Sequence, residues 1–134
     1  KEKLKLEYRS SNLKDSDIVT NANFHLSYGD IDSINEKINQ IKIQREKNQP
    51  LKEKTSGSTF KNPQNMFAAK LIEKSGCKGL EVGDAKVSLK HSNFLINKGK
   101  ATSTDIEELG KQIRDKVYKK FDILLDWEIK IIGD

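Results

Sequence analysis

The sequence has little of what disulfides, metal centres or membrane spans require. Cys77 is the single cysteine among 134 residues, so no disulfide can form within the chain and no metal-ligand spacing surrounds it. A lone cysteine is compatible with a reducing compartment. No apolar run is long enough to cross a bilayer, and no signal-peptide pattern is present. We therefore expect no metal site and no membrane partner.

The chain also lacks an initiator methionine. It opens at Lys1, within the alternating polar and apolar pattern of residues 3–8. That alternation predicts a strand rather than a natural start. From this opening we expect a fragment of a longer protein.

Basic residues outnumber acidic residues, but the two kinds are interleaved along the chain. The sequence carries 25 Lys and Arg against 20 Asp and Glu, a net charge of +5, and its pI is about 9.2. A basic balance allows a non-enzymatic nucleic-acid-binding module. Mixed runs such as Gln44-Arg45-Glu46-Lys47 are more typical of a solvated surface, and no aromatic stacking motif accompanies them. A mildly positive field would also suit a small anionic substrate.

Hydrophobic periodicity predicts strands first and then a helix in the N-terminal third. Strands are expected over 3–8 and 18–28, with a turn over 9–12 between them. Asp30 or Asp32 is a candidate cap for a helix that runs to about Asn48, before Pro50. Its isoleucines share one helical face: Ile31, Ile34, Ile38 and Ile41.

The remainder alternates short strands and helices, so we predict an α+β fold with a small mixed sheet and helices packed on it. A loop over 51–63 leads to a helix over 64–75 that ends at Gly76. Gly79–Asp84 is rich in turn residues. Further predicted elements are strands over 87–89 and 94–97, a helix capped by Thr102 or Thr104, and a strand-rich tail over 123–132. The expected buried faces of the two helices are Phe67, Ala68, Leu71 and Ile72, and Ile106, Leu109, Ile113 and Val117.

One loop carries residue types suited to an oxygen-rich anionic ligand. In Ser56-Gly57-Ser58-Thr59-Phe60-Lys61-Asn62-Pro63, glycine lets the backbone turn tightly and expose a serine hydroxyl. Lys61 and Asn62 add a cation and an amide. From local chemistry alone, an ordinary polar loop is the more natural interpretation.

Two further sites stand out in strand patterns. Tyr8-Arg9 ends the first predicted strand, and an arginine fork matches a carboxylate or phosphate. Glu128 is an acid within the apolar tail, where alternation would point Trp127 and Ile129 away from it. A surface arginine and an exposed strand face are the alternatives that these patterns leave open. His91 and Cys77 have no activating neighbour in the sequence.

These segments together resemble the UDP-N-acetylenolpyruvoylglucosamine reductases, the MurB family. Residues 56–63 resemble its Gly-Ser-x-Phe-Lys-Asn-Pro signature, and residues 76–97 include a similar His-x-Asn-Phe-x-x-Asn piece. Tyr8-Arg9-Ser10-Ser11 resembles the motif that closes the family's FAD domain. The other similar pieces are Gln49-Pro50, Ala101-Thr102 with Asp105-Ile106, and Leu125–Ile129.

The resemblance implies a cytoplasmic bacterial flavoenzyme of peptidoglycan synthesis. NADPH would reduce FAD, which would reduce UDP-N-acetylglucosamine enolpyruvate to UDP-N-acetylmuramate. Carried over residue by residue, the catalytic set would be Arg9, Ser58 and Glu128, with Ser58 as proton donor. Tyr8, Gln49, Lys61 and Asn62 would bind substrate.

The resemblance also implies a division of the chain and a missing partner. Residues 1–28 would be the end of the FAD-binding domain, and residues 29–134 the substrate-binding domain. The FAD-binding half of the same protein would be absent, so the chain alone should be inactive. Trp127 departs from the family, which commonly has proline or a polar residue there.

Overall fold

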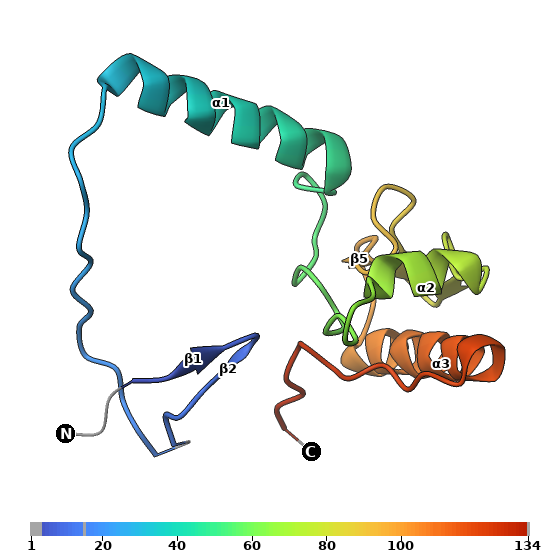
Figure 1. Ribbon diagram of the computed structural model, residues 1–134. Helices are drawn as coiled ribbons and strands as arrows, with labels where there is room; N and C mark the ends of the chain where they lie inside the picture. The colour runs from blue at the N-terminus through green and yellow to red at the C-terminus, as the bar shows by residue number, and fades with distance from the viewer. Residues whose placement is uncertain (1–3, 15, 134) are drawn as a thin grey trace. The chain divides into compact units, whose positions relative to one another are not determined.

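Residues 4–14 and 16–133 are described by a computed structural model (Figure 1). The chain divides into two compact units, Lys1–Ile38 and Asn39–Asp134. Each unit is described below by itself.

The first unit contains a short antiparallel hairpin of β1 (Leu6–Glu7) and β2 (Ser10–Ser11). The turn lies at residues 8–9, not over the predicted 9–12, because Arg9 has a left-handed backbone (φ 56°) that brings Ser10 back opposite Glu7. The predicted strand over 3–8 therefore ends at Glu7, and its first residue, Lys3, lies outside the described residues.

The strand predicted over 18–28 is not formed. The segment has extended, irregular backbone, and its large apolar side chains are exposed, including Phe24 and Leu26. A strand requires a neighbour to accept and donate its backbone hydrogen bonds. No described strand of the chain pairs with this segment, so the alternating sequence pattern alone does not produce one.

The predicted first helix is confirmed as α1 (Ile31–Asn48). The Asp30 carboxylate accepts a hydrogen bond from the Ser33 backbone N–H (2.9 Å), which lowers the pKa of Asp30. The helix ends before Pro50. Its isoleucine face is exposed, with Ile31 the most exposed at 74% and Ile34 the least at 46%.

The second unit contains a three-stranded antiparallel sheet in the order β3-β4-β5. Its strands are β3 (Glu81–Val82), β4 (Ala85–Val87) and β5 (Leu95–Asn97). The prediction missed β3, because Glu81 and Val82 lie between two turns of this stretch, one that includes Gly79 and one formed by Gly83 and Asp84. The other two predicted strands are present with shifted ends, and Val87 pairs with Leu95.

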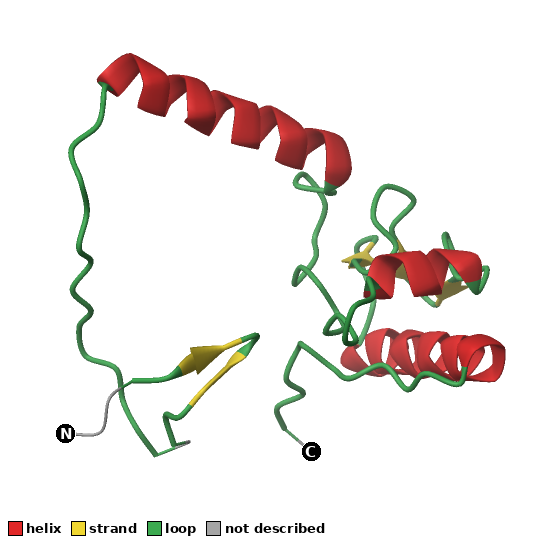
Figure 2. Ribbon diagram, viewed as in Figure 1, coloured by secondary structure: helices red, strands yellow, loops and turns green. Residues whose placement is uncertain are grey.

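The unit has two helices, α2 (Ala68–Lys74) and α3 (Ser103–Phe121): α3 packs against β3 and β4, and α2 lies beside α3 (Figure 2). Thr102 caps α3 as predicted. By contrast, α2 begins four residues later than predicted because Asn65 has a left-handed backbone (φ 58°) that precedes the helix with a turn. Phe67 was wrongly predicted to be buried: it is the N-cap of α2 and 59% exposed.

The core of the second unit lies between the two helices and the sheet. The predicted helix faces are confirmed for Ala68, Leu71 and Ile72 and for Leu109, Ile113 and Val117, whereas Ile106 is half-buried. Phe60 and Leu125, from segments without regular secondary structure, are also fully buried. The predicted α+β class is confirmed.

The C-terminal tail is not the strand-rich segment that its sequence predicts. Within residues 123–132, Trp127 alone forms a β-bridge, with Phe60. The tail is held instead by the burial of Leu125 and by individual backbone hydrogen bonds.

Candidate active site

Residues 58–61 form the middle of three backbone segments that lie together in the second unit. On one side, the Thr59 N–H donates to the carbonyl oxygen of Asn93 (2.8 Å). On the other side, the Glu128 N–H donates to the carbonyl oxygen of Thr59 (2.9 Å), and the Lys61 N–H donates to that of Asp126 (2.8 Å). These bonds join the predicted serine loop to the predicted acidic tail.

Ser58 is positioned by the turn that precedes it. Gly57 has φ 90°, a conformation that glycine adopts without strain. The Gly57 N–H donates to Thr55 Oγ1 (3.2 Å), and Ser58 then pairs with Phe94. Thr59 and Phe60 are buried, so the loop is anchored directly after a half-buried serine.

A hollow of about 370 Å³ adjoins this turn. Its lining includes two oppositely charged side chains, Arg45 and Glu53, and the polar side chain of Gln49. Ser56 and Gly57 also line it. This size falls at the lower end of the range for small-ligand sites. The hollow is therefore large enough for part of a ligand that also reaches Ser58.

The structure places three of the predicted substrate-binding residues around the same loop. Gln49 lines the hollow, and Lys61 is exposed at the end of the central segment. The Asn62 side-chain oxygen accepts a hydrogen bond from the Ala68 N–H (3.0 Å) at the start of α2. Asn62 therefore has a structural role that its sequence context did not indicate.

Glu128 is half-buried beside the central segment, and its Oε2 atom is shielded from solvent. Its backbone bond to Thr59 places it across from the residue that follows Ser58. The strand-like alternation of side chains predicted around Glu128 is not formed, because the chain bends at residues 128–129.

Tyr8 and Arg9 lie in the first unit. They form the hairpin turn, where the Arg9 guanidinium carbon lies 5.8 Å from the centroid of the Tyr8 ring. Both side chains are exposed, and Arg9 has the left-handed backbone described above. An arginine in this conformation is uncommon, and such strained residues are often found at functional sites.

Sequence reasoning missed Asn93, which organises the site from within. Its side-chain oxygen accepts from the Phe60 N–H (3.0 Å), and its side-chain nitrogen donates to the Phe60 carbonyl (2.8 Å). Asn93 is 3% exposed. A polar residue directly before the apolar run Phe94-Leu95-Ile96 was the available signal.

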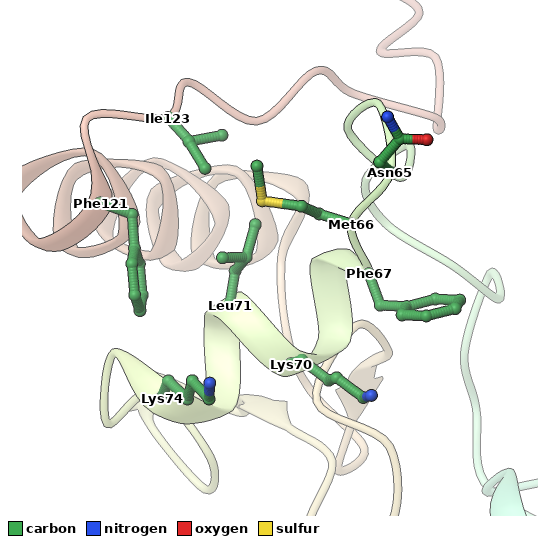
Figure 3. A pocket seen from close by; sticks show the side chains of 8 residues that line it. All are labelled: Asn65, Met66, Phe67, Lys70, Leu71, Lys74, Phe121 and Ile123. Carbon is green, nitrogen blue, oxygen red and sulfur yellow. The ribbon is translucent and has the colours of Figure 1, made fainter.

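A larger hollow in the second unit lies elsewhere. It measures about 560 Å³ and contains none of the predicted site residues. Figure 3 shows its apolar side chains from α2, α3 and the segments beside them, with two lysines at the rim. Its lining is Asn65, Met66, Phe67, Lys70, Leu71, Lys74, Phe121 and Ile123.

The described residues contain no group suited to a metal ion and no helix suited to a bilayer. No cluster of three or more His, Cys, Asp or Glu side chains there could hold a metal ion. Among the same residues, no helix is long and apolar enough to cross a membrane.

Comparison of the chain with known protein families shows which family it belongs to. Residues 49–132 match the family model for the C-terminal domain of UDP-N-acetylenolpyruvoylglucosamine reductase. The chain belongs to the UDP-N-acetylenolpyruvoylglucosamine reductase family. The matched range includes Gln49, Ser58, Lys61, Asn62 and Glu128.

Individual reductases are similar over nearly the whole chain. The enzyme of Clostridium novyi is 49% identical over 135 residues, which cover 100% of this chain and 44% of the relative. That of Novosphingobium aromaticivorans is 49% identical over 126 residues, covering 94% and 42%. A crystal structure of the reductase from Thermus caldophilus matches with a TM-score of 0.79 and 37% identity, covering 93% of this chain and 45% of that one. The chain thus spans less than half the length of these reductases.

Proposed function

We propose that this chain supplies the substrate-binding part of a reductase that converts UDP-N-acetylglucosamine enolpyruvate to UDP-N-acetylmuramate, in bacterial cytoplasmic peptidoglycan synthesis. The observation that carries the proposal is the pairing of the Ser58 loop with the Glu128 segment through the Thr59 carbonyl. That pairing brings a hydroxyl residue and a carboxylate residue, distant in sequence, to neighbouring backbone positions, and the turn that precedes Ser58 lines a hollow.

The chemistry requires a proton donor and a charge stabiliser. Reduction of the enolpyruvyl double bond adds a hydride to one carbon and leaves enolate-like charge on the other carbon and the carboxylate. Ser58 would donate the proton to that second carbon. Arg9 would stabilise the carboxylate charge, and Glu128 would orient Ser58 or tune its proton transfer, because serine is a poor acid unless assisted.

The remaining predicted residues would bind the substrate around this centre. Gln49 and the hollow that it lines would take part of the sugar nucleotide. Lys61 is exposed and cationic, and would contact its anionic groups. Tyr8 would act beside Arg9. Asn62 would act mainly by fixing the loop to α2, since its side-chain oxygen already accepts from Ala68.

The described residues do not by themselves fit FAD. The hollow beside Ser58 is about 370 Å³ and is lined on its charged rim by both Arg45 and Glu53. The sequence has no glycine-rich dinucleotide loop. FAD and NADPH are therefore proposed to bind to the rest of the reductase, and the roles assigned above concern only the proton and the carboxylate.

We further propose that residues 1–28 complete the FAD-binding domain and that residues 29–134 form the substrate-binding domain. Phe24 and Leu26 are more than 80% exposed, and the isoleucine face of α1 is also exposed. Large apolar side chains left exposed in this number are typical of surfaces that pack against another polypeptide. The partner would be the FAD-binding half that the full-length relatives contain.

The experiment that tests this function is a fusion of the chain to the N-terminal part of the Clostridium novyi relative. The fusion should reduce the enolpyruvate substrate with NADPH. Ser58→Ala should lower kcat by about 100-fold or more, the usual contribution of a general acid. Ser103→Ala, at an exposed position in α3, is the control. Full turnover in the Ser58→Ala fusion would disprove the assigned role.

The alternative, a basic nucleic-acid-binding module, rests on the pI of about 9.2 alone. It predicts oligonucleotide binding that weakens steeply as salt rises. Amide NMR titrations of the chain with the sugar nucleotide and with an oligonucleotide at two salt concentrations separate the two functions. Salt-sensitive shifts with the oligonucleotide alone would favour the module.

A further inference from the structure

Trp127 occupies a notch in the surface of α3 that a single glycine provides. Gly110 is buried in the middle of α3. A methyl group at Gly110 would lie 2.7 Å from Trp127 Cζ3 and would overlap Cη2 still more closely. The indole ring therefore rests directly on the helix backbone, and no other residue type leaves room for it.

The presence of glycine at this position is itself informative. Glycine in a helix interior is unfavourable relative to alanine, because it loses more backbone freedom on folding. Gly110 has a helical backbone and needs no left-handed conformation. Its use in the helix is explained by the ring that it accommodates.

Two other residues hold the same ring. The centroids of the Phe60 and Trp127 rings lie 4.8 Å apart, and the two ring planes are inclined at 36° to each other. The Arg114 guanidinium carbon lies 5.8 Å from the indole centroid, and Arg114 Nε donates to the carbonyl oxygen of Leu125 (2.8 Å). The position of Trp127 is thus set by α3 on one side and by the central segment on the other.

Trp127 links the backbone segments of the two proposed catalytic residues, Ser58 and Glu128, to α3. It directly precedes Glu128 in the chain, and it pairs with Phe60, two residues after Ser58. A displacement of the indole ring would shift the backbone that carries Glu128 and would loosen its bond to Thr59.

We propose that Trp127, seated against Gly110, is a positioning residue that sets the carboxylate of Glu128 relative to Ser58. The inference rests on the proposed function, because it assumes that Glu128 and Ser58 act in the same reaction. It explains how this chain tolerates a tryptophan next to the acid: α3 contains the matching gap.

The test is Gly110→Ala, studied in two preparations. In the 134-residue chain, where Trp127 is the only tryptophan, the substitution should shift tryptophan fluorescence to longer wavelength and increase its quenching by acrylamide. In the reductase fusion, kcat should fall by about tenfold to 100-fold, the scale of a small misplacement of a catalytic group. KM should change little, because the interaction lost is one made in the transition state.

A second substitution separates positioning from simple damage to the fold. Gly110→Ala combined with Trp127→Phe replaces the indole by a smaller ring that leaves room for the new methyl group. The double variant should recover most of the lost kcat. Lys111→Ala, at the next and exposed position of α3, controls for altered helix propensity. All rates are measured per folded enzyme, well below each variant's melting temperature.

The outcomes distinguish this inference from the proposed function. Loss of turnover in Glu128→Gln with normal turnover in Gly110→Ala would overturn the positioning role and leave the proposed function in place. Normal turnover in Glu128→Gln would overturn the role assigned to Glu128 and the positioning role with it, whereas a parent fusion that does not turn over would overturn the proposed function. Unchanged fluorescence in Gly110→Ala would show that the ring is not seated in the notch, and would overturn the inference whatever the kinetics.

Discussion

The carboxamide of Asn93 forms two hydrogen bonds to the backbone of Phe60, one to its N–H and one to its carbonyl. Both partners are buried, and the Asn93 carbonyl accepts a third bond from Thr59. The Asn93 side chain thus pairs with the backbone of Phe60 as a neighbouring strand would. Without it, the central segment would have two buried backbone groups to satisfy.

Replacing Asn93 with alanine should therefore destabilise the second unit strongly. Two buried backbone groups of Phe60 would lose their partners, at about 1–3 kcal/mol for each group left unsatisfied. The free energy of unfolding, measured by urea titration, should fall by roughly that sum. Asn39→Ala, at an exposed position of α1, should stay within about 0.5 kcal/mol of the parent. Equal stability of the two variants would contradict the clamp.

Replacing Thr102 with alanine should weaken the start of α3. The Thr102 side chain accepts from the Asp105 N–H (3.1 Å), and the Asp105 carboxylate accepts from the Thr102 N–H (2.9 Å). Loss of an N-cap of this kind costs about 1 kcal/mol. Thermal and urea unfolding should both detect it. Thr104→Ala, two residues later and without a capping bond, should be nearly neutral, and a loss of equal size there would argue against the cap.

Acid should weaken the contact between the sheet and the segment after β5. Lys98 and then Lys86, as hydrogen-bond donors to Glu81 at 2.6 and 2.9 Å, lower the pKa of Glu81 below its ordinary value of 4.5. A lowered carboxyl pKa means that this stabilisation is present above about pH 4.5 and is lost as the pH falls further.

The Glu81→Gln variant tests this dependence. Its stability should fall less than that of the parent between pH 7 and about pH 3, as measured by urea midpoints. The difference should shrink in high salt, because Glu81 and Lys98 are exposed to solvent and Lys86 is partly exposed, so their charges are screened. Identical acid profiles for parent and variant would show that the cluster makes no contribution.

The sequence by itself determined the helices and pointed to the loop of the candidate site. Capping residues and 3.6-residue periodicity are local signals, so α1 and α3 could be located from Asp30, Thr102 and their apolar faces. The serine, lysine and asparagine of residues 56–63 could be recognised because their order along the chain carries the resemblance to the reductase family.

The short strands were less predictable, because a strand depends on a partner that its own sequence pattern does not identify and because these strands are very short. Residues 18–28 have a clear alternating pattern and no strand partner among the described residues, whereas β3 has almost no pattern and pairs with β4 through a two-residue turn. A strand exists only when a neighbour completes its hydrogen bonds, and two-residue strands are too short to show periodicity.

Tertiary structure alone decided how the site is assembled. Nothing in the sequence links Asn93 to Phe60, or Trp127 to a glycine seventeen positions before it. These contacts depend on side-chain shape and on buried backbone groups that must find partners, and both are fixed only when distant segments pack together. The sequence could name Ser58 and Glu128; the packing of Trp127 against Gly110 and Phe60 brought their segments side by side.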